Sequence, residues 1–317
     1  MINLKSLAEK LKTEKSVAIF CHMRPDGDAI GSALALYHAL ISLGKRADVY
    51  CSDAIPTRFS YLDGVDNFSS SVFGDYSCFV AVDSADINRL GDLGSVFLKK
   101  NNTYNVDHHI SNTAYARYNS VIDSASNCEN IFELIKYLNA DITPAIANAL
   151  ATGVITDTGN FKHKSVTPKT LLVASELKKA DADFNQIIYR MFNEQTKERA
   201  KLFGLVMSKI RYLLDGKLAV ASVLQSDLES SGALPDETEG FIDFVMGIKG
   251  VEVGVCIMQI GRDKYKCSLR SKTVDVNAVA SRFGGGGHIL ASGCQIQGEY
   301  EEVVDDIRYA VKQQIPE

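Results

Sequence analysis

The chain has 317 residues. Because a single hydrophobic core rarely supports a domain of this size, we expect two domains. Apolar residues make up 46% and charged residues 23% of the chain, a composition typical of folded globular proteins and not of disordered ones. The formal net charge of −5 provides no broad basic surface for long duplex nucleic acid. Any nucleic-acid substrate is therefore expected to be short and bound in a local pocket.

The cysteines and the N-terminal segment bear on the cellular compartment. The seven cysteines are odd in number and show no CxxC spacing, which argues against a disulfide framework or a zinc ribbon. Residues 1–16 are polar and lack the apolar core of a signal peptide. No apolar run approaches the ~18 residues that a membrane-spanning helix needs. These features predict a cytoplasmic location.

Strand and helix patterns alternate through the first part of the chain. Short β-rich apolar runs predict strands at 16–21, 46–51, 78–82 and 103–106, and helical spacing predicts helices over 29–44, 128–139 and 144–155. Thr167 before Pro168 is a typical helix start, with an N-capping hydroxyl and proline at the first helical position. This alternation predicts an α/β domain with a parallel sheet and helices on both faces.

The pattern changes in the second part of the chain. A long polar helical stretch predicts a connector helix over 186–212. After it, runs at 218–223, 251–260, 265–271 and 293–298 predict strands, with short helices near 236–247 and 275–282 and a last helix over 301–315. We therefore expect a first domain over 1–185, the connector, and a smaller α/β domain with a mixed sheet over 213–317.

Acidic and imidazole side chains gather where the predicted strands of the first domain end. They are His22, followed by Asp26 and Asp28; Asp83; Asp107, His108 and His109; and Asp157, which follows a helix-like stretch. In parallel α/β sheets, ligands bind outside the carboxyl ends of the strands. We therefore expect these side chains to meet at one edge of the sheet, with Asp157 brought there by its helix.

The donor types indicate which metal they suit. Carboxylates and imidazoles without a thiolate favour Mn²⁺ or Mg²⁺-like ions and argue against a structural zinc site. The four charges of Asp26, Asp28, Asp83 and Asp157 would match two divalent cations, and without metal the carboxylates would repel one another. Two ions about 3.5–4 Å apart could hold a bridging hydroxide and clamp the oxygens of an in-line displacement at phosphorus.

Each of these residues taken alone has a simpler explanation. Asp26 in Pro-Asp-Gly could be a turn residue, and Asp28 could be a helix N-cap. Asp83 could cap a loop, Asp157 could belong to a turn, and His108-His109 could face solvent. Only the complete set, in this order along the chain, points specifically to a metal centre.

In this order the motifs resemble those of the DHH phosphoesterase superfamily. Segment 22–32 (HMRPDGDAIGS) resembles its first motif, 82–84 (VDS) its second, 107–109 (DHH) its third and 156–159 (TDTG) its fourth. Segments 268–271 (SLRS) and 284–288 (GGGGH) resemble the signature of the DHH-associated C-terminal domain. The resemblance spans about residues 15–295 and is greatest to the nanoRNase/pAp phosphatase subgroup, also called bifunctional oligoribonuclease and PAP phosphatase.

The resemblance implies two bound Mn²⁺ ions, with Mg²⁺ or Co²⁺ as alternatives. It assigns one ion to His22, Asp26 and Asp83, and the other to Asp28, Asp83, His108 and Asp157, so that Asp83 bridges. It also implies that His109 faces the substrate phosphate and that Asp107 orients the histidine pair. The predicted catalytic residues are therefore Asp83, Asp107, His108 and His109.

The second domain carries the predicted substrate-binding residues. Arg270 ends a predicted strand, and its planar fork suits bidentate contact with a phosphate, although most arginines simply lie at the surface. The glycine run 284–287 is longer than a helix C-cap needs and could cradle an anion with its N–H groups, or serve as a hinge. We expect Arg270, Gly285, Gly286, Gly287 and His288, together with His109, to bind the substrate.

These features predict a hydrolase that cuts very short RNA to mononucleotides and 3′-phosphoadenosine 5′-phosphate (pAp) to AMP, by attack of a metal-bridged hydroxide on phosphorus. A cyclic dinucleotide phosphodiesterase, acting on cyclic di-AMP or its linear product, remains an alternative with the same domain plan. A non-catalytic nucleotide-binding module is a second alternative, which the intact ligand set disfavours. The expected partners are small nucleotides and short single-stranded RNA, without long duplexes or a membrane, and a homodimer through the first domain fits this architecture.

Overall fold

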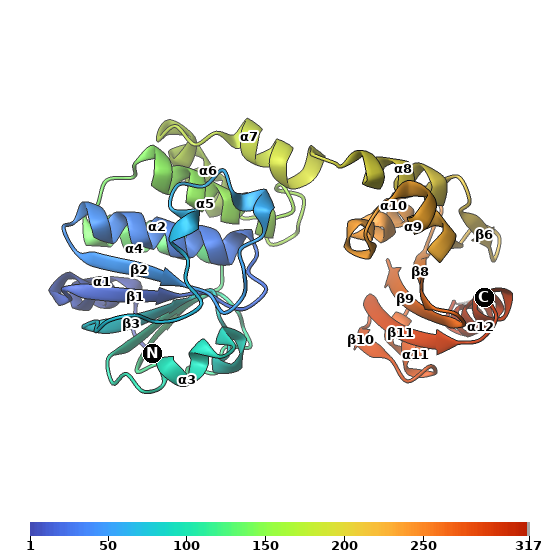
Figure 1. The fold of residues 1–317 in the computed structure, drawn as a ribbon, viewed down its shortest axis with the longest axis horizontal. Helices are drawn as coiled ribbons and strands as arrows, with labels where there is room; N and C mark the ends of the chain where they lie inside the picture. The colour runs from blue at the N-terminus through green and yellow to red at the C-terminus, as the bar shows by residue number, and fades with distance from the viewer. Residues whose placement is uncertain (316–317) are drawn as a thin grey trace. The chain divides into compact units, whose positions relative to one another are not determined.

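The computed structural model describes residues 1–315. The chain divides into two compact units, residues 1–194 and 195–317 (Figure 1). Among the described residues, no helix is both long and apolar enough to cross a bilayer.

The first unit is built on a five-stranded sheet in which every neighbouring pair is parallel. Its strands are β1 (Ser16–Phe20), β2 (Arg46–Tyr50), β3 (Cys78–Val82), β4 (Thr103–Asp107) and β5 (Tyr118–Val121), in the order β2-β1-β3-β4-β5. The four strands predicted from the sequence and their parallel arrangement are confirmed. The edge strand β5 was not predicted, because its short run Tyr-Asn-Ser-Val carries a weak apolar signal.

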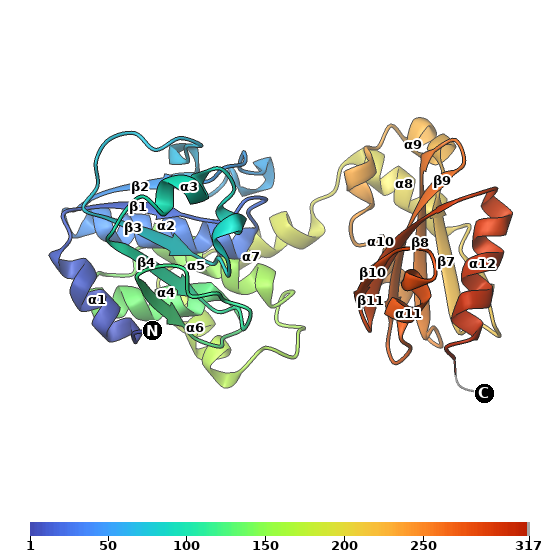
Figure 2. The ribbon, with the colours of Figure 1, turned by 90° about the horizontal axis from the view of Figure 1, so that it is seen from below.

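Helices cover both faces of this sheet, as predicted, but unequally. Val17 and Ile19 of β1 face a large core formed with α1 (Leu4–Thr13), α2 (Gly27–Ser42), α4 (Asn127–Leu138) and α5 (Pro144–Asp157). Ala18 and Phe20 face a smaller core formed with η3 (Ile87–Leu90) and α3 (Leu93–Phe97). Figures 1 and 2 show α3 on the opposite side of the sheet from α4 and α5. The unit also contains η1 (Thr57–Phe59), η2 (Val65–Asn67), α6 (Pro168–Lys179), which starts at the predicted cap Thr167, and α7 (Phe184–Ile188).

Glycines bring α2 and α5 into very close, antiparallel contact. A Cβ at Gly31 would overlap the carbonyl oxygen of Ala149, and a Cβ at Gly153 would overlap the carboxylate of Asp28. The same is true of Gly27 and the side chain of Thr156, one residue before Asp157. The N-terminal end of α2 therefore lies against the C-terminal end of α5, which brings Asp28 and Asp157 to the same edge of the sheet.

The prediction of one connector helix over 186–212 is wrong. Helix α7 runs into a π-helical turn, η4 (Tyr189–Asn193), and Glu194 is extended. A new helix, α8 (Lys197–Met207), begins after Thr196, whose side chain accepts a hydrogen bond from the Arg199 amide and caps it. Residues 186–212 therefore do not form one continuous helix. The boundary between the two units falls in the break between η4 and α8.

The second unit contains a mixed six-stranded sheet, as predicted. Its strands are β6 (Arg211–Leu213), β7 (Leu218–Val223), β8 (Val253–Gly261), β9 (Lys264–Ser271), β10 (Gly286–His288) and β11 (Ala291–Gln297), in the order β10-β11-β9-β8-β7-β6. Only β7 and β8 pair in parallel. One face packs on α11 (Val276–Ser281) and α12 (Tyr300–Lys312), and the other on α8, α9 (Gln225–Ser231) and α10 (Phe241–Gly247), with η5 (Pro235–Thr238) preceding α10. Strands β6 and β10 and helix α9 were not predicted.

Replacing Gly31 by alanine is expected to destabilise the first unit by roughly 1–3 kcal/mol, because the new methyl group would overlap the Ala149 carbonyl. Gly204→Ala in α8 is the matched control, since nothing lies within 4 Å of its Cβ position. There the higher helix propensity of alanine should stabilise the protein by roughly 0.5–1 kcal/mol. Thermal unfolding followed by circular dichroism measures both, and an unchanged midpoint for Gly31→Ala would contradict the close contact between α2 and α5.

Candidate metal centre

The predicted ligand residues of the first unit meet at the carboxyl edge of its sheet. His22 follows β1, Asp83 follows β3, and the segment 107–109 stands at the end of β4. Three sets of side chains each offer ligand atoms within 4.8 Å of one another: His22, Asp26 and Asp83; Asp28, His108 and Asp157; and Asp83, His108 and His109. The two ligand sets implied by the sequence resemblance thus lie side by side, with Asp83 between them.

Asp83 faces both sets with different oxygens. Its Oδ2 lies 3.6 Å from Nε2 of His22, and its Oδ1 lies 3.4 Å from Nε2 of His108. The residue is only 2% exposed, and Oδ1 has no hydrogen-bond partner within the described residues. Its φ of 52° is in the left-handed region, which is strained for a non-glycine residue. Asp83 is thus a buried carboxylate between two imidazoles, and one of its oxygens has no partner among the described residues. These are the features expected of a bridging metal ligand in the metal-free protein.

Backbone carbonyls fix the orientation of both imidazoles. The Nδ1 of His22 lies 2.8 Å from the carbonyl of Met23, and the Nδ1 of His108 lies 3.0 Å from that of Ser124. A carbonyl only accepts, so each Nδ1 carries the proton and donates it. Each Nε2 then faces the carboxylates, His22 toward Asp26 at 3.7 Å and His108 toward Asp157 at 3.7 Å. Once neutral, both Nε2 atoms can bind a metal.

Helix N-termini hold the two acidic residues of the first motif. The Oδ1 of Asp26 accepts hydrogen bonds from the amides of Asp28 and Ala29, so Asp26 is the N-cap of α2 while also facing His22. Asp28 lies inside the first turn, and its two oxygens accept from the amides of Asn127 and Cys128 at the start of α4. The positive end of the α4 dipole favours this buried charge. The N-cap explanation therefore applies to Asp26 and not to Asp28.

Burial and mutual charge shift the pKa values of these groups. Burial and the charge of Asp83 raise the pKa of Asp157 to about 6. Burial opposes the charging of His22 and His108, but the carboxylates of Asp26 and Asp83 on one ring, and of Asp83 and Asp28 on the other, raise each pKa to about 10. In the absence of ions, protons on the imidazoles therefore offset part of the carboxylate charge. The donor set, its charge and the unpartnered Asp83 oxygen all fit divalent metal ions.

Asp107 and His109 form a second layer beside these ligands. The fully buried Asp107 accepts from Nδ1 of His109 at 2.8 Å with Oδ1, and from the Nδ2 of Asn112 at 2.6 Å with Oδ2. The same Asn112 amide donates to Oδ1 of Asn105 at 2.8 Å. Asp107 thus orients His109 alone, whereas the sequence resemblance implied both histidines. Asn112 and the Ser124 carbonyl were missed, because a backbone acceptor and a single asparagine carry no recognisable motif.

Two of the predicted substrate-binding residues of the second unit share one row of its sheet. Arg270 of β9 and His288 of β10 both pair with Ala291 of β11, one from each side. Residues directly opposite one another in antiparallel strands project from the same face. Arg270, which is half-buried, and the exposed His288 therefore project from one face across the small side chain of Ala291.

The glycine run 284–287 has a structural role in the fold, whether or not it also binds a ligand. A Cβ at Gly285 would overlap the carbonyl of Gly293, and one at Gly287 would overlap the carbonyl of Ala291, so these glycines let β10 lie against β11. The amides of Gly284 and Gly285 donate to the carbonyls of Ser281 and Ala280. The amide of Gly285 is therefore not available to the predicted N–H cradle in this conformation.

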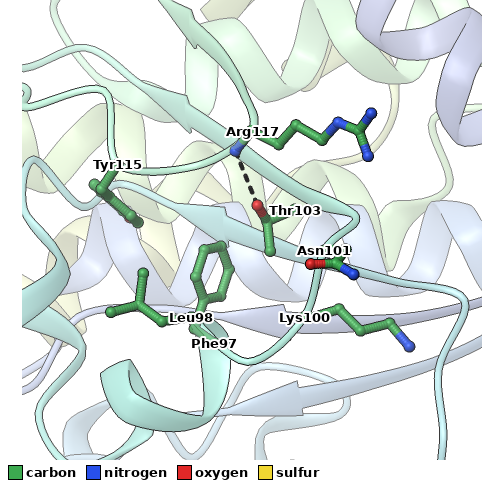
Figure 3. A pocket seen from close by; sticks show the side chains of 7 residues that line it. All are labelled: Phe97, Leu98, Lys100, Asn101, Thr103, Tyr115 and Arg117. Atoms are coloured by element: carbon green, nitrogen blue, oxygen red, sulfur yellow. Dashed lines mark hydrogen bonds between the residues drawn. The ribbon is translucent and has the colours of Figure 1, made fainter.

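A separate cavity of about 420 Å³ lies in the first unit (Figure 3). It is lined by Phe97, Leu98, Lys100, Asn101, Thr103, Tyr115 and Arg117, and the Arg117 amide donates to Thr103 across it. Thr103 begins β4, whereas Asp107 ends it. The cavity therefore lies toward the opposite end of the strand from the metal cluster and adds nothing to it.

Addition of Mn²⁺ is expected to raise the melting temperature, and excess chelator to lower it again, because an ion that binds only the folded state stabilises it. The gain should shrink as the pH falls through about 6, where Asp157 takes up a proton that the metal must displace. In Asp157→Asn this step should be absent. Scanning calorimetry across pH measures both, and a midpoint indifferent to Mn²⁺ would contradict the metal centre.

Comparison with known proteins places these residues in a family. The sequence matches the DHH family, N-terminal domain, over residues 16–154 and the DHHA1 domain over residues 215–317. The bifunctional oligoribonuclease and PAP phosphatase NrnA of Thermus thermophilus is 32% identical over 96% of this chain and 93% of that protein. The protein named probable bifunctional oligoribonuclease and PAP phosphatase NrnA of Streptococcus mutans is 28% identical over 98% of this chain and 100% of that protein.

A solved structure shares the whole fold. The crystal structure of an exopolyphosphatase-related protein from Bacteroides fragilis superimposes with a TM-score of 0.84 at 25% identity, covering 98% of this chain and 95% of that one. The resemblance read from the motifs is confirmed by matches that run through both units in the same order. The chain belongs to the DHH family, with a DHHA1 domain as its second unit.

Proposed function

We propose that this protein is a Mn²⁺-dependent phosphoesterase that degrades very short RNA to mononucleotides and hydrolyses pAp to AMP. The observation that carries the proposal is the buried Asp83, whose two oxygens face the Nε2 atoms of His22 and His108. The substrate class rests on the activities named for the relatives in Thermus thermophilus and Streptococcus mutans.

The chain's own residues would hold the ions and orient the phosphate. His22, Asp26 and Asp83 form one ligand set, and Asp28, Asp83, His108 and Asp157 the other. Divalent ions at these positions would lower the pKa of a water molecule and offset negative charge on the phosphoryl oxygens. Because the carbonyls of Met23 and Ser124 fix both imidazoles, little reorganisation of the ligands is needed when ions bind.

His109 is the side chain placed to meet the substrate phosphate. Its Nδ1 is held by Asp107, and its side chain is 42% exposed, unlike the buried ligands beside it. The hydrogen bond to Asp107 is the main reason that the pKa of His109 is raised. A raised pKa favours the protonated ring, in which Nε2 can donate a hydrogen bond to a phosphoryl oxygen.

The second unit would bind the end of the substrate that does not react. Arg270 and His288 lie two strands apart, roughly 10 Å, on one face of the sheet. The small Ala291 between them leaves room for a phosphate to contact both the guanidinium and the imidazole. Gly286 and Gly287, next to His288, let a ligand approach the backbone closely.

With Mn²⁺ present, the wild type should release AMP from pAp and mononucleotides from di- and trinucleotide RNA. Asp83→Ala should lower turnover by roughly 10³-fold, since it removes a ligand from both sets and the ions supply several kcal/mol of charge stabilisation. Asp75→Ala, at a carboxylate that is 98% exposed, is the control and should match the wild type.

The same assay distinguishes the alternatives. Equal turnover by wild type and Asp83→Ala would contradict the proposed chemistry. Preferential turnover of cyclic di-AMP would replace the substrate assignment while keeping the chemistry. No turnover of any substrate by protein with bound Mn²⁺ would favour a nucleotide-binding module.

Asn112→Ala is expected to lower kcat by roughly 10- to 100-fold, because Asp107 loses the donor that fixes it behind His109. Bound Mn²⁺ should stay constant, since Asn112 forms no side-chain hydrogen bond with the six predicted ligands within the described chain. Steady-state kinetics on pAp and metal analysis give the two readouts. The exposed Asn101 provides the control, Asn101→Ala, and wild-type kinetics in Asn112→Ala would show that His109 needs no such support.

A further inference from the structure

Arg89 reaches the metal cluster from a segment outside the recognised motifs. It lies in η3, six residues after Asp83, and its Nη2 is 3.3 Å from the Nδ1 of His22. Its carbonyl accepts from the Met23 amide at 2.7 Å, which fastens this turn to the residue after His22. The backbone of Arg89 is therefore held in place beside the cluster, while its side chain stays exposed.

The contact with His22 does not satisfy the guanidinium. The Nδ1 of His22 already donates its proton to the Met23 carbonyl, and a guanidinium has donors only. Within residues 1–315, Arg89 takes part in no ion pair, so no carboxylate lies within 4.0 Å of its head group. A guanidinium that faces another donor and has no carboxylate of the described residues within 4.0 Å is placed to bind an anionic ligand.

The charge of the cluster calls for such a cation. Two divalent ions balance Asp26, Asp28, Asp83 and Asp157, but the buried Asp107 adds a further negative charge. A phosphate monoester brings about −1.5 to −2 more at neutral pH. His109 can offset part of this charge on the side of Asp107. On the side of His22, Arg89 is the one lysine or arginine in residues 1–315 whose head group contacts a predicted ligand.

We propose that Arg89 binds the scissile phosphate of the substrate on the side of His22, an inference that rests on the proposed phosphoesterase function. Its planar fork can donate to two non-bridging oxygens at once. Because a charge-assisted hydrogen bond strengthens with the charge of its acceptor, Arg89 contributes more to a terminal dianionic phosphate than to a phosphodiester. Arg89 therefore favours pAp over dinucleotide RNA.

The test compares Arg89→Gln and Arg89→Lys with Arg117→Gln, an exposed arginine whose guanidinium lies over the Tyr118 ring, away from the cluster. Arg89→Gln should lower kcat/KM for pAp by roughly 10- to 100-fold and affect dinucleotide RNA less. Arg89→Lys should recover part of the loss, and Arg117→Gln should match the wild type. Bound Mn²⁺ and the melting temperature should be unchanged in all three.

Two results would overturn the inference. Arg89→Gln with the wild-type kcat/KM for pAp would show that the guanidinium does not bind the phosphate. Loss of Mn²⁺ together with activity would show that Arg89 supports His22 and acts through it.

Failure of the proposed function would be recognised separately. If the wild type turned over neither substrate, inorganic phosphate would be titrated into the Mn²⁺-loaded wild type and Arg89→Gln by calorimetry. Weaker phosphate binding in Arg89→Gln would support the inference in that case, and equal affinity would overturn it.

Discussion

The first unit is organised around the burial of one carboxylate, that of Asp83. Removing a charge from water costs several kcal/mol unless other charges compensate it. Here the compensation comes from two imidazoles on opposite sides, whose distances to Asp83 are 3.6 and 3.4 Å. Asp83 follows β3, which pairs with β1 on one side and β4 on the other, and both ligand sets include Asp83 or lie beside it. Its position therefore determines where the other ligands must lie.

The backbone supplies the support that side chains alone could not. The start of α4 holds Asp28 through two amides, and the close contact of α2 with α5 places Asp157 opposite it. Neither contact tolerates much movement. The first depends on the positions of the two α4 amides, and the second depends on glycines that have no Cβ between α2 and α5. The carboxylates are therefore held near one another despite their repulsion, and burial together with this repulsion raises the pKa of Asp157 and Asp28.

The parts of this arrangement that have strong local signals could be predicted from the sequence. Strands β1 to β4 are apolar and β-rich, and the ligands stand at their ends, so both followed from the pattern. Strand β5 was missed because Asn119 and Ser120 are buried although polar, and β10 was missed because glycine has a low strand propensity. The break before Thr196 was missed because the helical pattern on either side hid one capping residue.

The residues that surround the ligands could not be predicted in the same way. Asn112 acts on Asp107 through a loop, and the carbonyls of Met23 and Ser124 act through backbone atoms that every residue possesses. Their roles depend on where the chain returns in space, which spacing along the sequence does not reveal. Arg89 belongs to this group too, since only the fold shows that its guanidinium reaches His22.

Protons and metal ions compete for the same atoms in this site, and the exchange changes its charge. Without metal, His22 and His108, whose pKa values are raised to about 10, hold protons that offset part of the negative charge of Asp26, Asp28, Asp83 and Asp157. Two divalent ions in place of those protons would bring the same set to neutrality. A phosphate anion is repelled by the first form and tolerated by the second. Bound ions would then reduce the repulsion of the substrate phosphate, which Arg89 and His109 are placed to contact.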